Sequence, residues 1–331
     1  MRHKSISYAK YGYIFSIPFV VAFLIFTLYP LIYTVIIGFT DLKGLGKVDF
    51  KILDDPFYNF KLILHNKSFI KSLSNTAILW IANFIPQIGL SLLLAAWFTN
   101  RRYKIKGAGA FKVLFYMPNI IMPATIAILF NVLFGYPKGP VNDLLMGLGI
   151  IDEPEYFLIH VWPARGVISF IQFWMWYGNS MIVLMGGIMG INPTLFEAAE
   201  IDGASSTQTF FKVTLPNLKT ILLYMLVTSM IGGLQMFDIP NLFLNGGPDN
   251  STLTTSVFIY KQAFSGSYMY NRAAAASLLM FLIIAVLGAT LFYIMRDKDA
   301  IKINKEKKAL IKAAKLEAKA VKRANMEGAA V

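Results

Sequence analysis

Cysteine is absent from the sequence, and histidine occurs only three times. The chain therefore cannot form a disulfide bond or a thiolate metal site. The histidines, His3, His65 and His160, are scattered, and no two of them have the spacing of metal ligands. Charged residues are also scarce, at 15% of the chain, whereas hydrophobic residues make up 56%. This composition lies outside the range of ordinary soluble domains and indicates a protein embedded in a bilayer.

The sequence also lacks the motifs of common nucleotide-binding and catalytic sites. No GxxxxGK[ST] string occurs, and the nearest stretch, GLGKVD at Gly44, has neither the spacing nor the hydroxyl of a phosphate-binding loop. A nucleophile elbow, an HExxH zinc motif and a pair of carboxylates within one apolar segment are absent as well. We therefore expect no ATP hydrolysis or other enzyme activity from this chain alone, and no cofactor bound by it.

Six apolar stretches are long enough to cross a membrane, which takes about 20 residues per helix. They cover residues 11–39, 73–98, 111–134, 166–190, 218–239 and 273–295. The first is longer than the core of a signal peptide, and no small-x-small cleavage site follows it, so we interpret it as a membrane anchor. The predicted fold is an all-α polytopic membrane protein with six transmembrane helices in residues 11–295, flanked by tails at residues 1–10 and 296–331.

Lysine and arginine favour the cytoplasmic side of short loops, so their distribution predicts the orientation of the chain. With the N-terminus inside, the cytoplasmic segments hold 21 of the 31 basic residues and 8 of the 18 acidic residues. The whole net charge of +13 then lies in the cytoplasm, as do both termini. Because this topology accounts for the basic composition and no nucleic-acid motif accompanies it, we do not expect a nucleic-acid partner.

A polar stretch at residues 193–216 interrupts the apolar pattern between the fourth and fifth predicted spans. It begins with proline, which suits the first position of a helix, and Asn192 directly before it can cap that helix. Gly203 can take the left-handed conformation that ends it. Ser205 and Gln208 have the spacing of a capping box that opens a second helix. The stretch therefore predicts two short helices joined by a turn.

The first of these helices carries Glu197, Glu200 and Asp202 and no basic residue, on the side of the membrane where most of the charge is positive. A polar stretch of this kind cannot lie in lipid and must project into water. We expect it to be an acidic docking element. An ordinary polar loop that joins two spans is the alternative reading from composition alone.

The spacing of this stretch resembles the EAA loop of ABC importer permeases: E-A-A, three residues, G, nine residues, a β-branched residue, any residue and L-P. Val213 stands where isoleucine is commoner. The matching residues are Glu197, Ala198, Ala199, Asp202, Gly203, Ala204, Leu215 and Pro216. What the resemblance implies is a cytoplasmic coupling helix that docks in a groove of a separate ATPase subunit.

Other matches extend the resemblance over nearly the whole chain. Pro18 and the run LYPLIYTVIIGF from Leu28 are similar to the opening helix of the family. The segment after the fifth span resembles the signature of carbohydrate-type permeases, with matches at Gly246, Gly247, Pro248, Thr252, Tyr260, Ala263 and Phe264. The chain thus resembles a permease subunit of binding-protein-dependent carbohydrate importers, in the branch of the maltose transporter's larger permease, without room for the extra outer domain of that protein.

The resemblance also implies the partners of the subunit. It implies a second, related permease and a dimer of ABC ATPases, which would bind the ATP and magnesium. It further implies an extracellular or periplasmic solute-binding protein that delivers a sugar or oligosaccharide. The implied location is the inner or plasma membrane of a bacterial cell.

Polar residues inside an apolar span are costly and normally face the bundle interior or a water-filled path. In the fourth span, Gln172, Trp176 and Asn179 lie on one helical face, at steps of four and three residues. Sugars present hydroxyls to amides and flat C–H faces to aromatic rings, and both side-chain types are found here. We predict that these residues contact the substrate. An aromatic belt at headgroup depth is the alternative.

The third and fifth spans add further candidates. Asn119 lies between two prolines, where a broken helix would expose backbone and an amide to a sugar hydroxyl; a structural role is equally compatible with the sequence. In the fifth span, Ser229, Gly233 and Gln235 approach the outer side. The family resemblance implies a binding cavity lined by the third to sixth spans, so we predict these residues in it.

Two other polar groups in the spans are interpreted as structural. Asp238, near the outer boundary, is expected to form a salt bridge with Arg272 at the start of the sixth span. Asn83 and Gln87 flank Pro86, and their amides can satisfy the carbonyls that the proline leaves free, so we interpret them as a helix-packing joint.

The predicted function is that of a transmembrane permease subunit of an ATP-driven ABC importer for a sugar or oligosaccharide. Such a subunit forms half of the translocation path and couples to its ATPase through the EAA loop. A related permease for a non-sugar solute such as a glycerol phosphodiester is the alternative. An ion-coupled secondary transporter would usually show ionisable residues deep in several spans or an inverted repeat, and neither is evident. A membrane scaffold would not require the amide and aromatic stripe.

Overall fold

The computed structural model describes residues 9–100, 105–266, 268–295 and 306–311. The predicted tails, residues 1–10 and 296–331, lie almost entirely outside these ranges, so their boundaries and roles stay predictions. Within the described ranges the regular structure is helical, and the extended backbone there forms only one isolated bridge, between Thr40 and Ile52. The predicted all-α class is therefore confirmed.

Five long apolar helices and one bent helix pair occupy the positions of the six predicted spans. The spans consist of α1, η1 and α2 (Ala9–Phe23, Leu24–Leu28, Tyr29–Gly38), α4 (Lys67–Phe98), α5 with α6 (Ala108–Ile120, Pro123–Leu133), α8 (Val161–Met189), α12 with α13 (Lys219–Leu234, Asp238–Leu244) and α15 (Tyr270–Met295). Five of them have the length and apolar composition that a bilayer requires, and α5 with α6 reaches that length only as a bent pair. The chain is a multi-pass membrane protein.

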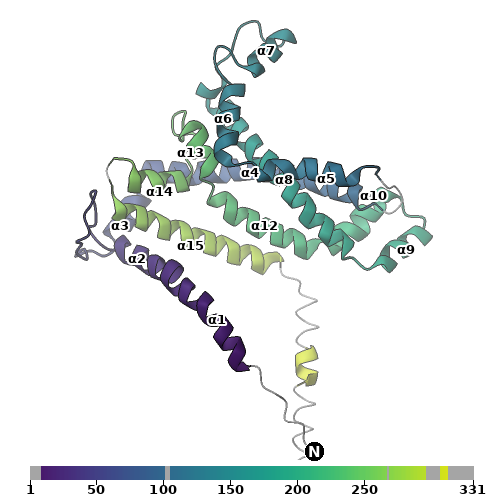
Figure 1. Ribbon diagram of the computed structural model, residues 1–331, viewed down its shortest axis with the longest axis horizontal. Coiled ribbons are helices and arrows are strands. Elements are labelled where there is room, and N and C mark those ends of the chain that lie inside the picture. The colour runs from purple at the N-terminus through teal and green to yellow at the C-terminus, as the bar shows by residue number, and fades with distance from the viewer. Residues whose placement is uncertain (1–8, 101–104, 267, 296–305, 312–331) are drawn as a thin grey trace, which may run out of the picture.

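The third span differs from a straight helix over residues 111–134. Its halves, α5 and α6, meet at an angle of 92°. The cause is local, because Pro123 has no N–H to continue the helix and the residue before it, Met122, has extended backbone. After the bend, α6 leaves the bundle and leads to an arm that also contains α7 (Pro140–Gly147) and η2 (Phe157–Ile159), at the top of Figure 1.

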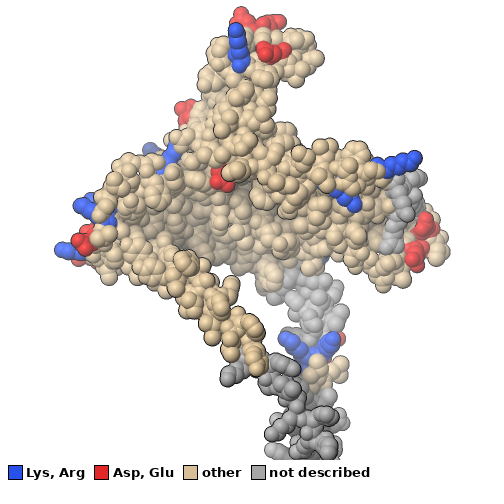
Figure 2. Space-filling model, viewed as in Figure 1, with Lys and Arg blue, Asp and Glu red and all other residues tan. Residues whose placement is uncertain are grey.

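The remaining spans run along the long axis of the body. In Figure 1, α4, α5 and α8 lie together, and α12 and α15 form a second row against them. Figure 2 shows charged side chains mainly at the two ends of this body and on the arm, whereas its long face is almost entirely uncharged. A surface of that kind suits contact with lipid, in which charged side chains are costly.

Short helices lie at the two ends of the body. At one end are α3 (Tyr58–Leu64) and α14 (Thr255–Phe264); at the opposite end are α9 (Pro193–Ile201), α10 (Ser206–Thr209), η3 (Phe210–Thr214) and α11 (Leu215–Asn217). The polar stretch at residues 193–216 thus lies at the end of the body opposite α3 and α14.

Hydrogen bonds among the described residues hold the end of the first span against the bundle. Asn59, which is buried, donates from Nδ2 to the carbonyl oxygens of Gly38 (3.0 Å) and Thr40 (2.9 Å). Asn271, at the start of α15, donates to Thr40 as well (3.3 Å). These bonds tie the end of α2 to α3 and α15. Further along, α1 diverges from α15 in Figure 1 and leaves its apolar surface exposed.

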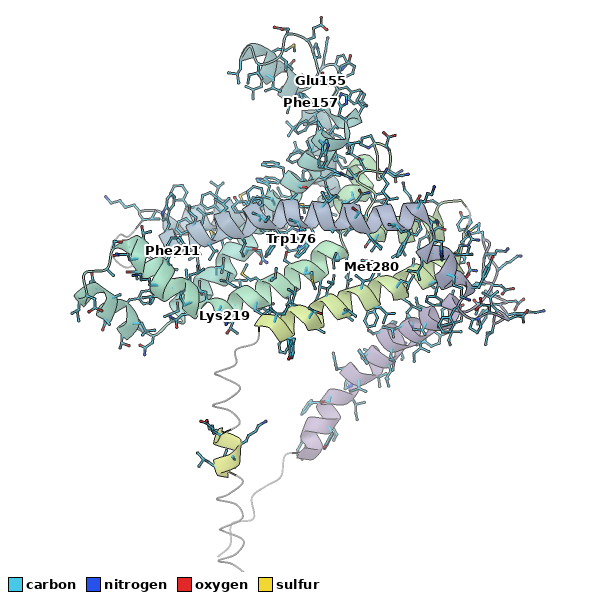
Figure 3. The ribbon with its side chains drawn as sticks, turned by 180° about the vertical axis from the view of Figure 1, so that it is seen from behind. Glu155, Phe157, Trp176, Phe211, Lys219 and Met280 are labelled. Atoms are coloured by element: carbon cyan, nitrogen blue, oxygen red, sulfur yellow. The ribbon has the colours of Figure 1, made fainter. Side chains whose placement is uncertain are left out.

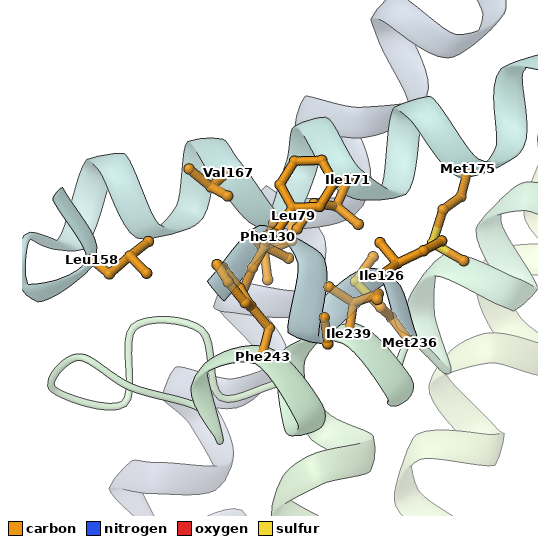
Figure 4. Packing of buried hydrophobic residues seen from close by; sticks show 12 residues of the cluster. Leu79, Ile126, Phe130, Leu158, Val167, Ile171, Met175, Met236, Ile239 and Phe243 are labelled. Atoms are coloured by element: carbon orange, nitrogen blue, oxygen red, sulfur yellow. The ribbon is translucent and has the colours of Figure 1, made fainter. Parts of the chain in front are cut away.

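An apolar cluster attaches the arm to the bundle (Figure 4). Ile126 and Phe130 of α6 pack against Ile171 of α8 and against Ile239 and Phe243 of α13. All five are buried, so the position of α6 after the bend is determined by contact with the fourth and fifth spans.

A glycine permits close approach of α5 and α8. A Cβ built on Gly178 would overlap the backbone carbonyl of Phe115, and backbone cannot move aside as a flexible side chain can. We predict that Gly178→Ala will separate the two helices and lower the free energy of unfolding by about 1–3 kcal/mol or more. The melting temperature of the purified protein in detergent measures the effect.

Gly186→Ala is the matched control, because Gly186 lies on the same helix and a Cβ there meets no atom within 4 Å. It should leave the melting temperature nearly unchanged. Equal melting temperatures for the two variants would contradict the proposed close contact between α5 and α8.

Candidate functional site

The polar stretch at residues 193–216 adopts the local structure that its sequence predicts. Asn192 accepts a hydrogen bond at Oδ1 from the N–H of Thr194 (3.1 Å) and so caps α9. Gly203 has φ +73°, in the left-handed region. Ser205 and Gln208 exchange hydrogen bonds between side chain and backbone N–H, at 2.8 and 3.3 Å, which is the predicted capping box. These three predictions of local structure are confirmed.

The end of α9 has the hydrogen bonds of a Schellman motif. The N–H of Gly203 donates to the carbonyl of Glu200 (3.1 Å), and the N–H of Ala204 donates to the carbonyl of Ala199 (2.9 Å). The positive φ of Gly203 makes this reversal possible at no steric cost. The E-A-A and D-G-A parts of the loop are thereby held within one compact helix end.

The surface of α9 combines acidic and apolar groups. Glu197, Glu200 and Asp202 are exposed, and Ile201 between them has 87% of its surface accessible. On the other side of the helix, Phe196 packs against the apolar cluster at the end of α8. The helix therefore presents carboxylates and Ile201 on one side and contacts the bundle with the other.

The second half of the stretch spans a cavity. A space of about 750 Å³ separates it from the ends of α4 and α8, with Trp97, Met189 and Phe211 among its lining residues. The helix here widens into the π-helical turn η3, a distortion that often marks functional sites. Leu218, which is fully buried, anchors the chain again where α12 begins. The stretch therefore packs on the bundle through Phe196 and Leu218 and lines a cavity between these two points.

A second cavity lies between α4, α8 and α12–α13, where Figure 3 shows Trp176 midway along the body. It has a volume of about 410 Å³, within the usual range of small-molecule sites. Six of the seven residues predicted to bind substrate line it: Gln172, Trp176, Asn179, Ser229, Gly233 and Gln235. The fold thus brings candidates from two spans to one space.

Asn119 lies apart from this group. It is not among the residues that line the cavity, and its Nδ2 donates to the backbone carbonyl of Met175 at 3.3 Å. The bond joins α5 to α8 just before the bend of the third span.

The fifth span is broken beside the cavity. Between α12 and α13, residues 235–237 leave the helical conformation, and the hydroxyl of Thr254 donates to the free carbonyl of Met236 (2.7 Å). Backbone of this kind is tolerated at membrane depth only where protein or a water-filled cavity surrounds it. The break turns Gln235 and Asp238 towards the cavity.

The expected salt bridge between Asp238 and Arg272 is wrong. No ion pair joins the two side chains, both of which are described, and Asp238 lines the cavity instead. Sequence spacing placed both residues at the outer ends of their spans, but the direction of Asp238 depends on the break after α12.

Sequence reasoning missed Trp80. Its indole N–H donates to Oγ of Ser229 (3.2 Å), and its ring lies where a Cβ on Gly233 would be. Asn83 and Gln87 line the cavity too, while their amide groups make structural bonds to Leu79 O and Ser180 Oγ, at 2.8 and 2.7 Å. Trp80, Asn83 and Gln87 follow steps of three and four residues on α4, a pattern of the same type as that on α8, and this signal could have identified Trp80 and placed all three residues at the cavity.

Arg165 was missed as well. At the end of α8 that lies opposite α9, its Nε donates to Ser251 O (3.0 Å) and its Nη2 to Asn75 Oδ1 (2.6 Å). Asn75 in turn donates to the carbonyls of Asn250 (2.7 Å) and Leu253 (3.1 Å). Two spans thus hold the turn-rich loop that follows α13. Each of these bonds joins two residues whose separation in the sequence lies between 86 and 178 positions. No sequence pattern indicates contacts at such separations.

Comparisons with known proteins bear on the family to which the sequence is similar. The family described as binding-protein-dependent transport system inner membrane component matches residues 87–298. The lactose transport system permease protein of Rhizobium radiobacter is 31% identical over 87% of this chain and 94% of its own length. The arabinooligosaccharides transport system permease protein of Bacillus subtilis (strain 168) is 30% identical over 83% of this chain and 85% of its own.

A solved structure has the same fold. It belongs to a bacterial ABC transporter involved in the import of the acidic polysaccharide alginate. The matching chain is 25% identical, with a TM-score of 0.73, and the match covers 86% of this chain and 94% of that one.

The contact between Gly233 and Trp80 generates a prediction about the cavity wall. Gly233→Ala would place a methyl group in the indole ring, so Trp80 must move and the cavity must change shape. We expect a shift in tryptophan emission of the purified protein. The shift should disappear when Trp80 is also replaced by Phe.

Gly232→Ala provides the comparison, since a Cβ on this neighbouring residue meets no atom within 4 Å. It should leave the emission unchanged. An identical spectrum for both glycine variants would show that Trp80 does not pack on Gly233.

Proposed function

The chain belongs to the family of binding-protein-dependent transport system inner membrane components, and on this basis we propose that it is a permease subunit of an ATP-driven sugar importer in a bacterial cell membrane. The observation that carries the proposal is the pairing of two sites on one bundle. A cavity with amide and tryptophan side chains lies midway along the spans, and an exposed acidic helix lies at one end.

The chemistry of the cavity supports a saccharide as the substrate. Gln172, Asn179 and Gln235 supply amide donors and acceptors, while Trp176 and Trp80 supply flat apolar faces. Sugars have hydroxyls around the ring edge and C–H groups on its faces, so they match both. The similar permeases from Rhizobium radiobacter and Bacillus subtilis belong to lactose and arabinooligosaccharide transport systems. The hydrogen bond of Asn119 to α8 favours a packing role for that residue.

The acidic helix α9 supports coupling to a separate ATPase subunit. The chain has no phosphate-binding loop of its own, so ATP and magnesium bind to partner subunits. Ile201 and the carboxylates of Glu197 and Asp202 form the contact surface, and Ala199 and Gly203 hold the helix in its compact form. This end of the chain, together with both termini, faces the cytoplasm.

In this mechanism a solute-binding protein docks at the opposite end, near α14 and the loop held by Arg165. Closure of the ATPase dimer moves α9, and the spans attached through Phe196 and Leu218 follow as a rigid body. The cavity then alternates between the two sides of the membrane, and hydrolysis resets it. A second, related permease completes the path. The exposed apolar surface of α1 provides a further contact for that subunit.

Gly203 offers a test of coupling. Gly203→Val forces a β-branched residue into the left-handed region at a cost of about 1–2 kcal/mol, although the position has ample space. We expect the variant to insert in the membrane but to lose uptake and substrate-stimulated ATP hydrolysis in the assembled importer.

Gly203→Asn is the control, because asparagine tolerates positive φ. It should retain a large part of the uptake. Normal transport by the valine variant would remove α9 from the coupling role.

The predicted contacts of Trp176 and Asn179 with the substrate can be tested separately. Trp176→Ala and Asn179→Ala should each weaken uptake by about tenfold, because each removes a stacking surface or a hydrogen bond worth about 1–2 kcal/mol. Basal ATP hydrolysis by the importer should be unaffected. Uptake kinetics of radiolabelled sugar in proteoliposomes provide the measurement.

Two variants on the same helix serve as references. Trp176→Phe keeps an aromatic face and should recover part of the uptake. Ile182→Ala alters an exposed residue outside the cavity and should have no effect. Wild-type kinetics for both alanine variants at the predicted site would exclude substrate binding there.

A further inference from the structure

The cavity between α4, α8 and α12–α13 has an unusual balance of charge. Among its lining residues Asp238 is the only acidic one, and none is Lys, Arg or His. The other polar groups are neutral amides, hydroxyls and indoles. A ligand in this space therefore meets one negative charge of the chain and no positive one.

The carboxylate of Asp238 is not neutralised by a neighbouring cation. Its side chain is exposed and makes no ion pair or hydrogen bond within the described residues. Two cations at this end bond elsewhere: Arg165 to Asn75 and Ser251, and Lys261 to the carbonyl of Asn245 (2.7 Å). Arg272 forms no ion pair with Asp238. Without such a partner, the charge of Asp238 acts on whatever enters the cavity.

We infer that Asp238 is a specificity-determining residue, which makes the cavity selective for uncharged saccharides and unfavourable for uronates and other anionic sugars. The inference rests on the proposed function and names its substrate class. Amides such as Gln172, Asn179 and Gln235 bond neutral hydroxyls well. A sugar carboxylate finds no charged donor among the lining residues, and it is repelled by Asp238.

The size of the effect follows from the repulsion of two unit charges. At about 6 Å, the repulsion corresponds to a few-fold change in affinity in bulk water and about a hundredfold at an effective dielectric constant of about 20. A water-containing cavity in protein lies between these limits. We therefore expect discrimination of about tenfold by Asp238.

The test uses the assembled importer, with its permease and ATPase partners, in nanodiscs of uncharged lipid and without the binding protein. The probes are three neutral trisaccharides, maltotriose, raffinose and arabinotriose, and one acidic trisaccharide of mannuronate. Calorimetric titration at low ionic strength gives each dissociation constant. Wild-type importer should bind at least one neutral probe about tenfold more tightly than the mannuronate probe.

Asp238→Asn, which is nearly isosteric, should bring the two affinities within about twofold by strengthening mannuronate binding. Asp238→Ser, a smaller uncharged variant, should do the same and guards against an effect particular to asparagine. Asp143→Asn removes a charge on α7, outside the cavity, and should keep the wild-type ratio. Co-purification of the partner subunits confirms assembly of each variant.

The outcomes distinguish failure of the inference about Asp238 from failure of the proposed saccharide function. If a neutral probe binds but the ratio is the same in wild type and both Asp238 variants, the charge of Asp238 does not select the substrate and the saccharide function stands. If mannuronate binds wild type as tightly as the neutral probe, the inference is likewise wrong. If no probe binds wild type, the saccharide function fails, and the inference fails with it.

Discussion

Every backbone N–H and C=O group in the hydrocarbon region needs a partner within the protein, and the structure depends on this constraint. Uninterrupted helices meet it for most of the chain. The chain leaves the helical conformation at residues 121–122 and 235–237, and at the second break Thr254 supplies a hydrogen bond to the carbonyl of Met236. Residues at this second break, among them Gln235 and Asp238, line one side of the cavity.

Small residues determine where two helices, or a helix and an aromatic ring, pack closely together. Gly178 lets α8 approach the backbone of α5, and Gly233 lets the ring of Trp80 lie against α12. Lipid is as apolar as the side chains, so close packing and hydrogen bonds between helices replace the hydrophobic effect as the source of association. The same contacts that hold α4, α8 and α12 together therefore shape the wall of the candidate binding site.

The two ends of the body are built in different ways. At the end that we assign to the cytoplasm, α9 is shaped by caps within a few residues of one another, at Asn192, Gly203 and Ser205. At the other end, Arg165 and Asn75 join loops and spans that are far apart in sequence. A helix shaped by local caps can move as a unit against its partner. At the opposite end, hydrogen bonds from Arg165 and Asn75 hold a loop in position between the spans. This difference suits a subunit that receives motion at one end and substrate at the other.

The sequence alone determined the all-helical class, the six apolar segments, the turn structure of residues 193–216 and the amide and aromatic face of Gln172, Trp176 and Asn179, because each depends on local propensity or helical period. The prolines of the third span indicated where a helix could break. Tertiary structure decided the 92° direction of that bend, the packing of Trp80 on Gly233, and the turn of Asp238 into the cavity instead of towards Arg272. Each depends on which surfaces meet across long sequence separations, and periodicity carries no information about those contacts.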